Sequence, residues 1–260
     1  ITWPSSSKGD HLVLRPALAA VALLAVAAPA LAQAPGSVRL EVEAGASFLT
    51  RNDARIPGNG GTRFDLNKLQ GDPTAVPVRV TLDWQALENH GLRFSYQRLR
   101  TEGTGTLPGP TRFRDTVFSP GVATEGFYQF DTWRATYRYT AYRSQDLQLF
   151  VGATLLVRDA EIRLSGGGQR VSRTDLGLVP LLHLAAEWQA APRLRLIAEV
   201  DGLAAPQGYA IDAALRGAFA ITPRWEATLS YRFLDGGADN DRVFNFATFH
   251  SVTGGLAVRF

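Results

Sequence analysis

Histidine and acidic side chains in the second half of the chain are the first candidates for chemistry. His183 and Glu187 lie four residues apart in an alternating segment, so they share one face of a strand, and Asp201 follows on the next segment. A base, an orienting carboxylate and a nucleophile are what hydrolysis requires. His250 and Ser251 are adjacent, so their side chains point to opposite faces and form no simple dyad. The spacing therefore supports a hydrolase only through His183 and Glu187, as an alternative hypothesis.

A second candidate is the acidic stretch "DGGADND", which places Asp235, Asp239 and Asp241 within seven residues. Carboxylate oxygens are the ligands that Ca²⁺ prefers, but the ordered spacing and final glutamate of an EF-hand loop are missing. Asp, Asn and Gly also favour turns, because their side chains bond the local backbone and tolerate positive φ. We interpret this stretch as a turn, and the sequence predicts no metal site and no cofactor.

Arginines gather in two loop-like stretches. Guanidinium groups bind phosphates through two parallel hydrogen bonds, which suits a partner that presents phosphates, while a solvated loop surface explains the same residues equally well. These arginines are Arg51, Arg55, Arg63, Arg98, Arg100, Arg112 and Arg114.

The largest group of charged residues lies on one face of alternating segments, opposite the apolar face. Both signs occur on neighbouring segments, so we expect the side chains to pair inside a narrow barrel and to plug it. Pairing of Arg134 or Arg138 with carboxylates such as Asp83 is part of this expectation. The predicted lumen charge network comprises Arg39, Glu41, Glu43, Arg79, Asp83, Arg93, Arg134, Arg138, Glu187, Arg195, Glu199, Asp201, Asp212, Arg216, Glu226, Arg232 and Arg259.

Strands must position these side chains. From Val38 the stretch "VRLEVEAGASF" alternates between apolar and mostly charged residues, and nine further segments do the same, ending with "FHSVTGGLAVRF". Several segments approach the roughly 9–11 residues that a tilted membrane strand needs. The pattern predicts an all-β fold, a ten-stranded antiparallel transmembrane β-barrel with up-and-down topology.

The connections between these segments alternate in length. Short turns at the periplasmic end and longer loops at the extracellular end are typical of a transmembrane barrel with both termini on the periplasmic side. The short turns are expected at 88–90, 144–146, 190–192 and 222–224, and the longer loops at about 51–76, 101–126, 165–174, 204–208 and 235–245.

Aromatic residues indicate which face meets lipid. Four of them lie near the short turns or at the chain end, on apolar faces, and predict a belt at one membrane interface: Trp84, Trp188, Trp225 and Phe260. Phe48, Tyr209 and Phe246 lie near the longer loops and predict the opposite belt. The apolar face therefore points to lipid, whereas a soluble barrel would be apolar inside.

The N-terminal region predicts export. The run "ALAAVALLAVAAPALAQ" follows Arg15 and ends in a small-x-small site, so residues 1–32 are interpreted as an N-terminal extension with a signal peptide, and 33–260 as one barrel domain. No cysteine is present, which excludes disulfides and thiolate metal sites. The 27 basic and 24 acidic side chains are too balanced to indicate a nucleic-acid partner.

The signal, the alternating strands and the terminal Phe260 together resemble Gram-negative outer-membrane β-barrel proteins, over residues 33–260. Within that class, "NDARIPGNGGTRFDL", "DGLAAPQG" and "DGGADNDRVFNFATFH" are similar to stretches of a group of small barrels without assigned activity. The resemblance implies an outer-membrane location, the lipid bilayer and lipopolysaccharide as partners, and recognition of the last strand by the barrel-assembly machinery. No omptin-like or deacylase-like pattern is present.

The sequence thus predicts a barrel with a narrow, charged and occluded lumen, and a role in structure, binding or passage of a small solute. Two alternatives stay open: a membrane-embedded hydrolase that acts on lipid or peptide, and a soluble periplasmic lipid-binding barrel.

Overall fold

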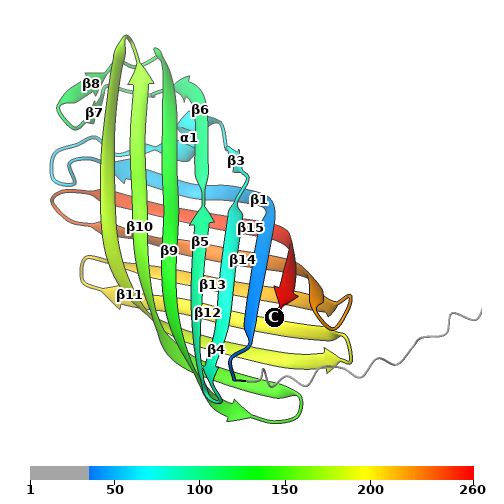
Figure 1. Cartoon of the computed structure of the whole chain (residues 1–260). Coiled ribbons are helices and arrows are strands. Elements are labelled where there is room, and N and C mark those ends of the chain that lie inside the picture. The colour runs from blue at the N-terminus through cyan, green and yellow to red at the C-terminus, as the bar shows by residue number, and fades with distance from the viewer. Residues whose placement is uncertain (1–34) are drawn as a thin grey trace, which may run out of the picture.

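The structure is a computed structural model that describes residues 35–260, and these residues form a closed antiparallel β-barrel (Figure 1). Ten strands make the wall, as the sequence predicts, and neighbours in the chain are neighbours in the sheet. They are β1 (Val38–Arg55), β4 (Val78–Leu87), β5 (His90–Arg98), β9 (Ala123–Arg143), β10 (Leu147–Gly166), β11 (Gln169–Ala191), β12 (Leu194–Ala205), β13 (Gly208–Ala220), β14 (Trp225–Asp239) and β15 (Phe244–Arg259).

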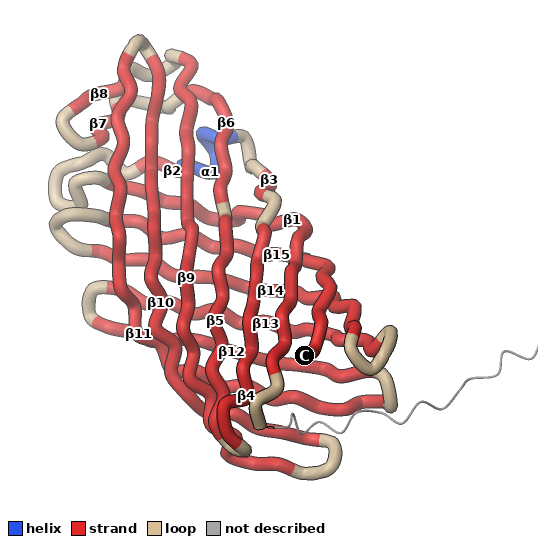
Figure 2. The backbone as a smooth tube through the Cα atoms, viewed as in Figure 1, coloured by secondary structure: helices blue, strands red, loops and turns tan. Residues whose placement is uncertain are grey.

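Smaller elements lie within the connections (Figure 2). They are β2 (Phe64–Asp65), α1 (Leu66–Gln70), β3 (Thr74–Ala75), β6 (Arg100–Thr106), β7 (Thr111–Phe113) and β8 (Thr116–Phe118). Strand β6 continues the line of β5 along β9, and β7 pairs with β8. Among residues 35–260 no helix is both long and apolar enough to cross a membrane. The predicted signal peptide and the boundary at residue 33 lie outside the described residues.

The barrel closes between its first and last strands. β15 pairs with β1 from Arg39↔Arg259 to Arg55↔Phe244 and with β14 on its other side, and the Phe260 N–H donates to the Val38 carbonyl at 2.9 Å. Closure gives both edges a partner, which strands in lipid require because no water is present to satisfy free backbone groups.

The two faces of the wall differ in polarity: the apolar face points outward and the charged face inward, as the sequence predicts. On β1, Arg39, Glu41 and Glu43 are buried inside the barrel while Val42 and Phe48 are exposed on the outside. The same alternation holds on the other wall strands, where the outside carries mainly leucine, valine and aromatic side chains. This arrangement is the reverse of a soluble lipid-binding barrel, so that alternative is not supported.

The two ends of the barrel differ. At one, called here the turn end, the four predicted short turns join β4–β5, β9–β10, β11–β12 and β13–β14. At the other, the loop end, only two long connections are present, residues 56–77 and 107–122. The loops expected at 165–174, 204–208 and 235–245 are instead mostly strand, with short turns at their tips, because β10–β15 continue pairing there.

Strands β9, β10 and β11 are 21, 20 and 23 residues long, about twice the length that crosses a membrane, and rise beyond the other strands at the loop end (Figure 1). Their outer face becomes polar there: Gln129 donates to Asp159 at 3.0 Å and Arg163 to Glu161 at 3.2 Å. The apolar belt therefore ends near the rung formed by Asp159 and Leu176.

An apolar plug fills one side of the lumen at the loop end, where the sequence predicts only loops. Helix α1 is capped by Asp65, which accepts from the Lys68 N–H at 3.1 Å, and ends at Gly71 in the left-handed conformation. Its side chains pack closely on β9, where a Cβ on Gly126 would lie 2.7 Å from Leu66 Cδ1. The plug comprises Leu49, Ala54, Ile56, Phe64, Leu66, Leu69, Ala75, Leu99, Leu107, Phe113, Phe118, Tyr128, Ile162, Leu164, Ala247 and Phe249.

The apolar belt makes a quantitative prediction. Leu215 is 63% exposed on the outer face of β13, between Tyr209 near the loop end and Trp225 beyond the next turn, so Leu215→Arg should lower the free energy of unfolding by about 2–4 kcal/mol. The matched control Leu176→Arg, at a position 74% exposed on the Asp159 rung, should cost about 0–1 kcal/mol. Reversible urea unfolding in lipid vesicles measures both, and equal costs would contradict this placement of the belt.

Candidate functional site: a charged lumen beneath an apolar cavity

The lumen towards the turn end contains the charged residues that the alternation predicts. Fifteen of the seventeen predicted network residues have side chains at most 10% exposed inside the barrel: Arg39, Glu41, Glu43, Arg79, Asp83, Arg93, Arg134, Arg138, Glu187, Arg195, Glu199, Asp212, Arg216, Glu226 and Arg232. Asp201 and Arg259 join them. Arg216 reaches across to β1, to Glu41 at 3.1 Å and Glu43 at 3.4 Å.

Glu226 on β14 joins three arginines near the turn end. Its carboxylate lies 2.9 Å from Arg39, 3.1 Å from Arg195 and 2.6 Å from Arg259. Arg39 also lies 3.3 Å from Asp83 on the neighbouring strand β4. These contacts connect β1, β4, β12, β14 and β15 through the interior.

Glu199 on β12 is a second junction, deeper in the lumen. Its carboxylate lies 2.6 Å from Arg93, 2.9 Å from Arg232 and 3.7 Å from Arg216. Arg232 in turn contacts Asp212 at 2.5 Å. The guanidinium groups present several donors in a fixed fork, so one arginine can satisfy carboxylates on different strands.

The two arginines of β9 complete the network. Arg134 lies 2.5 Å from Asp212, and Arg138 lies 2.8 Å from Glu187 and 4.0 Å from Asp83. The result is one continuous set of ion pairs that bridges nine of the ten wall strands. Cross-links of this kind hold the wall strands at fixed distances.

Arg79 differs from the other network arginines. It is buried, yet no carboxylate of residues 35–260 lies within ion-pair distance of it. It donates instead to Gln97 at 3.0 Å and Ser95 at 3.2 Å, both on β5. The network thus holds one more arginine than it has carboxylates.

The histidine of the hydrolase hypothesis belongs to the network. His183 is 2% exposed, and its Nδ1 lies 2.8 Å from Asp201, which also accepts from Thr154 at 2.8 Å. Glu187, predicted to act with His183, contacts Arg138 and Arg195 instead. A histidine enclosed in this way is shielded from molecules in the lumen.

Little space remains between these side chains at the turn end. The hollow beside Asp83, Arg138 and Glu187 measures about 20 Å³, close to the minimum for one water molecule. The Arg138 guanidinium lies over the Phe150 ring, 4.0 Å from its centre. Charged and aromatic side chains thus surround this hollow closely.

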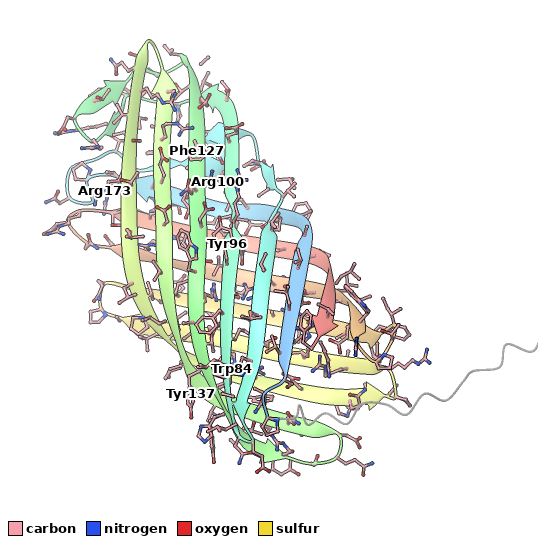
Figure 3. The ribbon with its side chains drawn as sticks, in the orientation of Figure 1. Trp84, Tyr96, Arg100, Phe127, Tyr137 and Arg173 are labelled. Atoms are coloured by element: carbon pink, nitrogen blue, oxygen red, sulfur yellow. The ribbon has the colours of Figure 1, made fainter. Side chains whose placement is uncertain are left out.

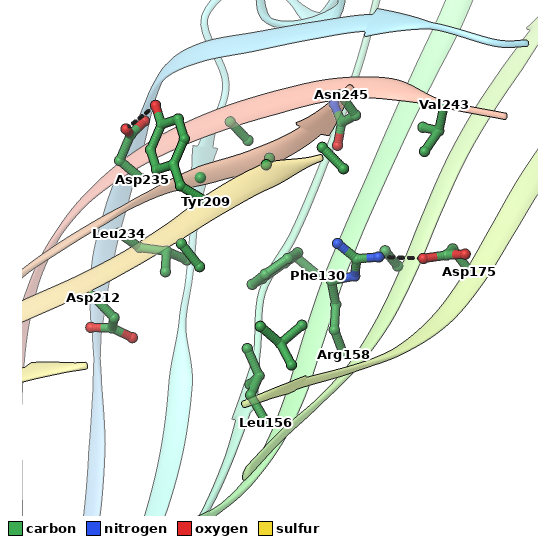
Figure 4. A pocket seen from close by; sticks show the side chains of 18 of the residues that line it. Phe130, Leu156, Arg158, Asp175, Tyr209, Asp212, Leu234, Asp235, Val243 and Asn245 are labelled. Carbon is green, nitrogen blue, oxygen red and sulfur yellow. Dashed lines mark hydrogen bonds and ion pairs between the residues drawn. The ribbon is translucent and has the colours of Figure 1, made fainter. Parts of the chain in front are cut away.

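Above the network, an apolar cavity of about 350 Å³ occupies the side of the lumen that the plug leaves free (Figure 4). Its walls come from β9, β10, β11, β12, β13, β14 and β15, and its size is at the lower end of ligand pockets in proteins. Apolar side chains dominate the lining, among them Phe130, Leu156, Val179, Leu181, Leu203, Leu234 and Phe249.

Ion pairs and hydrogen-bonded polar groups lie at the floor and the rim of this cavity. Arg134 and Asp212, paired at 2.5 Å, form the floor and belong to the charge network. At the rim, Arg158 pairs with Asp175 and the Tyr209 hydroxyl donates to Asp235 at 2.6 Å (Figure 4). No Ser, Thr, Cys or His is among the described residues that line the cavity. Its chemistry suits binding of an apolar molecule.

The predicted interface aromatics lie on the outer face. Trp84, Trp188, Trp225 and Phe260 are all exposed and lie towards the turn end, and Figure 3 shows Trp84 there beside Tyr137. Of the opposite set, Phe48 and Tyr209 are exposed and Phe246 is half-buried, with its ring 5.7 Å from that of Tyr209.

The loop-end arginines are mostly paired. Arg51 and Arg63 contact Asp53 at 3.0 and 2.9 Å, and Arg100 contacts Asp131 at 2.5 Å. Arg55 lies 3.5 Å from Asp239, while Arg98, Arg112 and Arg114 have no ion pair with any residue of 35–260. Pairing leaves fewer guanidinium groups free for phosphate than the sequence indicates.

The acidic stretch at 235–241 separates in the structure. Asp235 accepts from Tyr209 and Thr248, whereas Asp239 faces Arg55. No cluster of three or more metal-ligating side chains occurs among residues 35–260. His250 and Ser251 point to opposite faces, with His250 bonded to Tyr231 at 2.7 Å and Ser251 to Ser47 at 2.8 Å.

A closed barrel with an apolar outside and a charged inside defines the class: by fold, this protein is an outer-membrane β-barrel. No protein-family model matches the chain. A search of curated proteins found no match.

Solved structures are similar in fold. The outer membrane protease OmpT from Escherichia coli matches with a TM-score of 0.56 at 9% identity, over 87% of this chain and 97% of that chain. An outer membrane channel from Pseudomonas putida F1 matches with a TM-score of 0.45 at 9% identity, over 88% and 97%. The attachment invasion locus protein Ail of Yersinia pestis matches with a TM-score of 0.40 at 14% identity, over 87% and 99%. At such identities the likeness to OmpT is one of fold.

The cavity is the feature that the sequence analysis missed. One signal was present: Pro180, in the middle of β11, cannot donate to a strand ladder, and proline occurs within sheets mainly at edges. The plug also had a signal, since Gly103 and Gly105 on β6 admit the α1 backbone, and a Cβ on either would lie within 2.4 Å of a carbonyl oxygen.

Proposed function

We propose that this protein is an occluded outer-membrane barrel that binds a small apolar molecule in its loop-end cavity. The observation that carries the proposal is the cavity itself: about 350 Å³ of apolar space inside the barrel, beside the plug and above the charge network. An interior designed only for stability would fill such a space, because close packing is the norm in protein interiors.

Binding is supported over the other roles that the sequence left open. Passage of ions or solutes needs a continuous path, and the packed lower lumen supports none. Hydrolysis of a bound lipid or peptide needs a base at the substrate, and His183 lies outside the cavity lining.

The proposal predicts that the purified barrel conducts no ions across a planar lipid bilayer. Stepwise ion conductance in a single-channel recording would contradict occlusion.

Filling the cavity should weaken binding without unfolding the barrel. Val179 faces the cavity from β11, so Val179→Trp should weaken binding of 11-(dansylamino)undecanoic acid by about tenfold or more, because overfilling a packed site costs on the order of 1–3 kcal/mol. Dansyl fluorescence titration in detergent measures the affinity.

The control is Val157→Trp, at a position that faces outward on the neighbouring strand β10, on the rung of Leu178. It adds the same side chain beside the cavity but outside it, so the affinity should stay unchanged. Equal affinities of the wild type and both variants would overturn the cavity as the binding site.

A further inference from the structure

The barrel wall is open between β11 and β12 at the loop end. The two strands pair from Ala191↔Leu194 up to Leu182↔Gly202, and the ladder then stops. β11 nevertheless continues to Gln169 in full register with β10, and β12 continues to Ala205 in full register with β13. The opening therefore separates two intact hairpins.

The missing pairs fall beside the cavity. One step further in the same register would pair Leu181 with Leu203, and the next would pair Pro180 with Ala204, but none of these pairs forms. Leu181 and Leu203 both line the cavity, and Leu203 is 42% exposed although it points inward like Asp201. The point where the wall opens is thus also the side of the cavity.

The outer surface at the opening is apolar. Leu178 and Leu182 are 65% and 64% exposed on β11, with Pro180 between them. The polar outer face begins only at the pair Asp159↔Leu176, two residues along β10 from the pair Val157↔Leu178. The opening therefore lies at the upper border of the apolar belt, level with the lipid leaflet at the loop end.

Unpaired backbone at this level needs an explanation. In hydrocarbon each unsatisfied N–H or C=O costs several kcal/mol, so irregular backbone is tolerated only where it borders protein or a cavity. Pro180 removes one donor from the free edge of β11, and the turn Pro206–Gln207 ends β12 early. The sequence thus ends the ladder with specific residues.

We infer that the opening between β11 and β12 is a lateral portal through which a single-chain lipid passes between the loop-end leaflet and the cavity. This inference rests on the proposed binding function. The acyl chain lies along Leu203, Leu181 and Val179, and the headgroup remains at the rim, where Arg158, Asp175 and Arg173 supply polar groups. A double-chain phospholipid exceeds the space of about 350 Å³.

The test closes the portal covalently in the full chain, which has no cysteine of its own. Leu181→Cys/Leu203→Cys places thiols on the two facing edges of the portal, at the first position beyond the last pair, Leu182↔Gly202. The control, Leu184→Cys/Val200→Cys, joins the same two strands at a rung already paired below the portal. If the portal disulfide does not form, a short bis-maleimide bridges the same two thiols.

Uptake of 11-(dansylamino)undecanoic acid from preloaded vesicles into reconstituted barrel is followed by stopped-flow fluorescence. Cross-linking the portal pair should slow uptake by about tenfold or more, reduction of the disulfide should restore it, and cross-linking the control pair should leave it unchanged. Complete cross-linking with unchanged uptake, while the unmodified barrel still binds the probe in detergent, would overturn the portal alone. Absence of saturable binding in detergent would overturn the binding function and the portal with it.

Discussion

Deleting β15 (Phe244–Arg259) together with Phe260 is expected to abolish folding. β15 pairs with both β1 and β14, so its loss leaves two long strand edges without partners in lipid, where each free backbone group costs several kcal/mol. The measurement is refolding from urea into lipid vesicles, followed by the gel shift between unheated and heated samples, which reports closed barrel.

The point variant Phe260→Ala separates closure from recognition during biogenesis. Phe260 is 76% exposed, so its side chain adds little to the folded barrel, and the variant should refold in vesicles as the wild type does. In cells we expect less folded barrel, because we propose that the last strand with its terminal aromatic serves as an assembly signal, which it resembles. For the deletion of β15 described above, a gel shift between unheated and heated samples would contradict closure of the barrel by β15.

The second large effect concerns the charge network. Glu199→Gln should lower the free energy of unfolding by about 3–5 kcal/mol, since it leaves Arg93, Arg232 and Arg216 without a shared buried carboxylate. The loss is aggravated because Arg79 is already an unpaired cation in the same lumen. Urea unfolding monitored by tryptophan fluorescence in vesicles measures the change.

Two variants control for the charge itself. Glu88→Gln removes a carboxylate that is 79% exposed and 3.8 Å from Arg143 on the turn end, and should cost about 0–1 kcal/mol. The double variant Glu199→Gln/Arg232→Met also removes one of the three arginines that lose a carboxylate, and should recover part of the loss. A Glu199→Gln barrel as stable as the Glu88→Gln barrel would show that the lumen charges are hydrated.

The strand pattern and the polarity of the two faces could be predicted from the sequence because both depend on neighbours at i and i+2. In "VRLEVEAGASF" the alternation alone decides that Arg39 and Glu41 share a face, and any closed barrel turns that face inward. The short turns at the turn end were also predictable, because Asn, Asp and Pro mark them locally. The lengths of β10 and β11 were not, since Gly, Arg and Ser near residues 165–174 form strand only when a partner hairpin extends beside them.

The identity of the ion pairs, the plug and the cavity depended on tertiary structure. Arg216 meets Glu41 although they are 175 positions apart, and that contact is set by the stagger of all the strands between them. The sequence by itself determined a membrane barrel with charges inside. Only the folded barrel decided where the interior is packed and where it is open: α1 fills one side of the loop end, and the β11–β12 ladder stops at Leu182, because the space between strands depends on global register and closure.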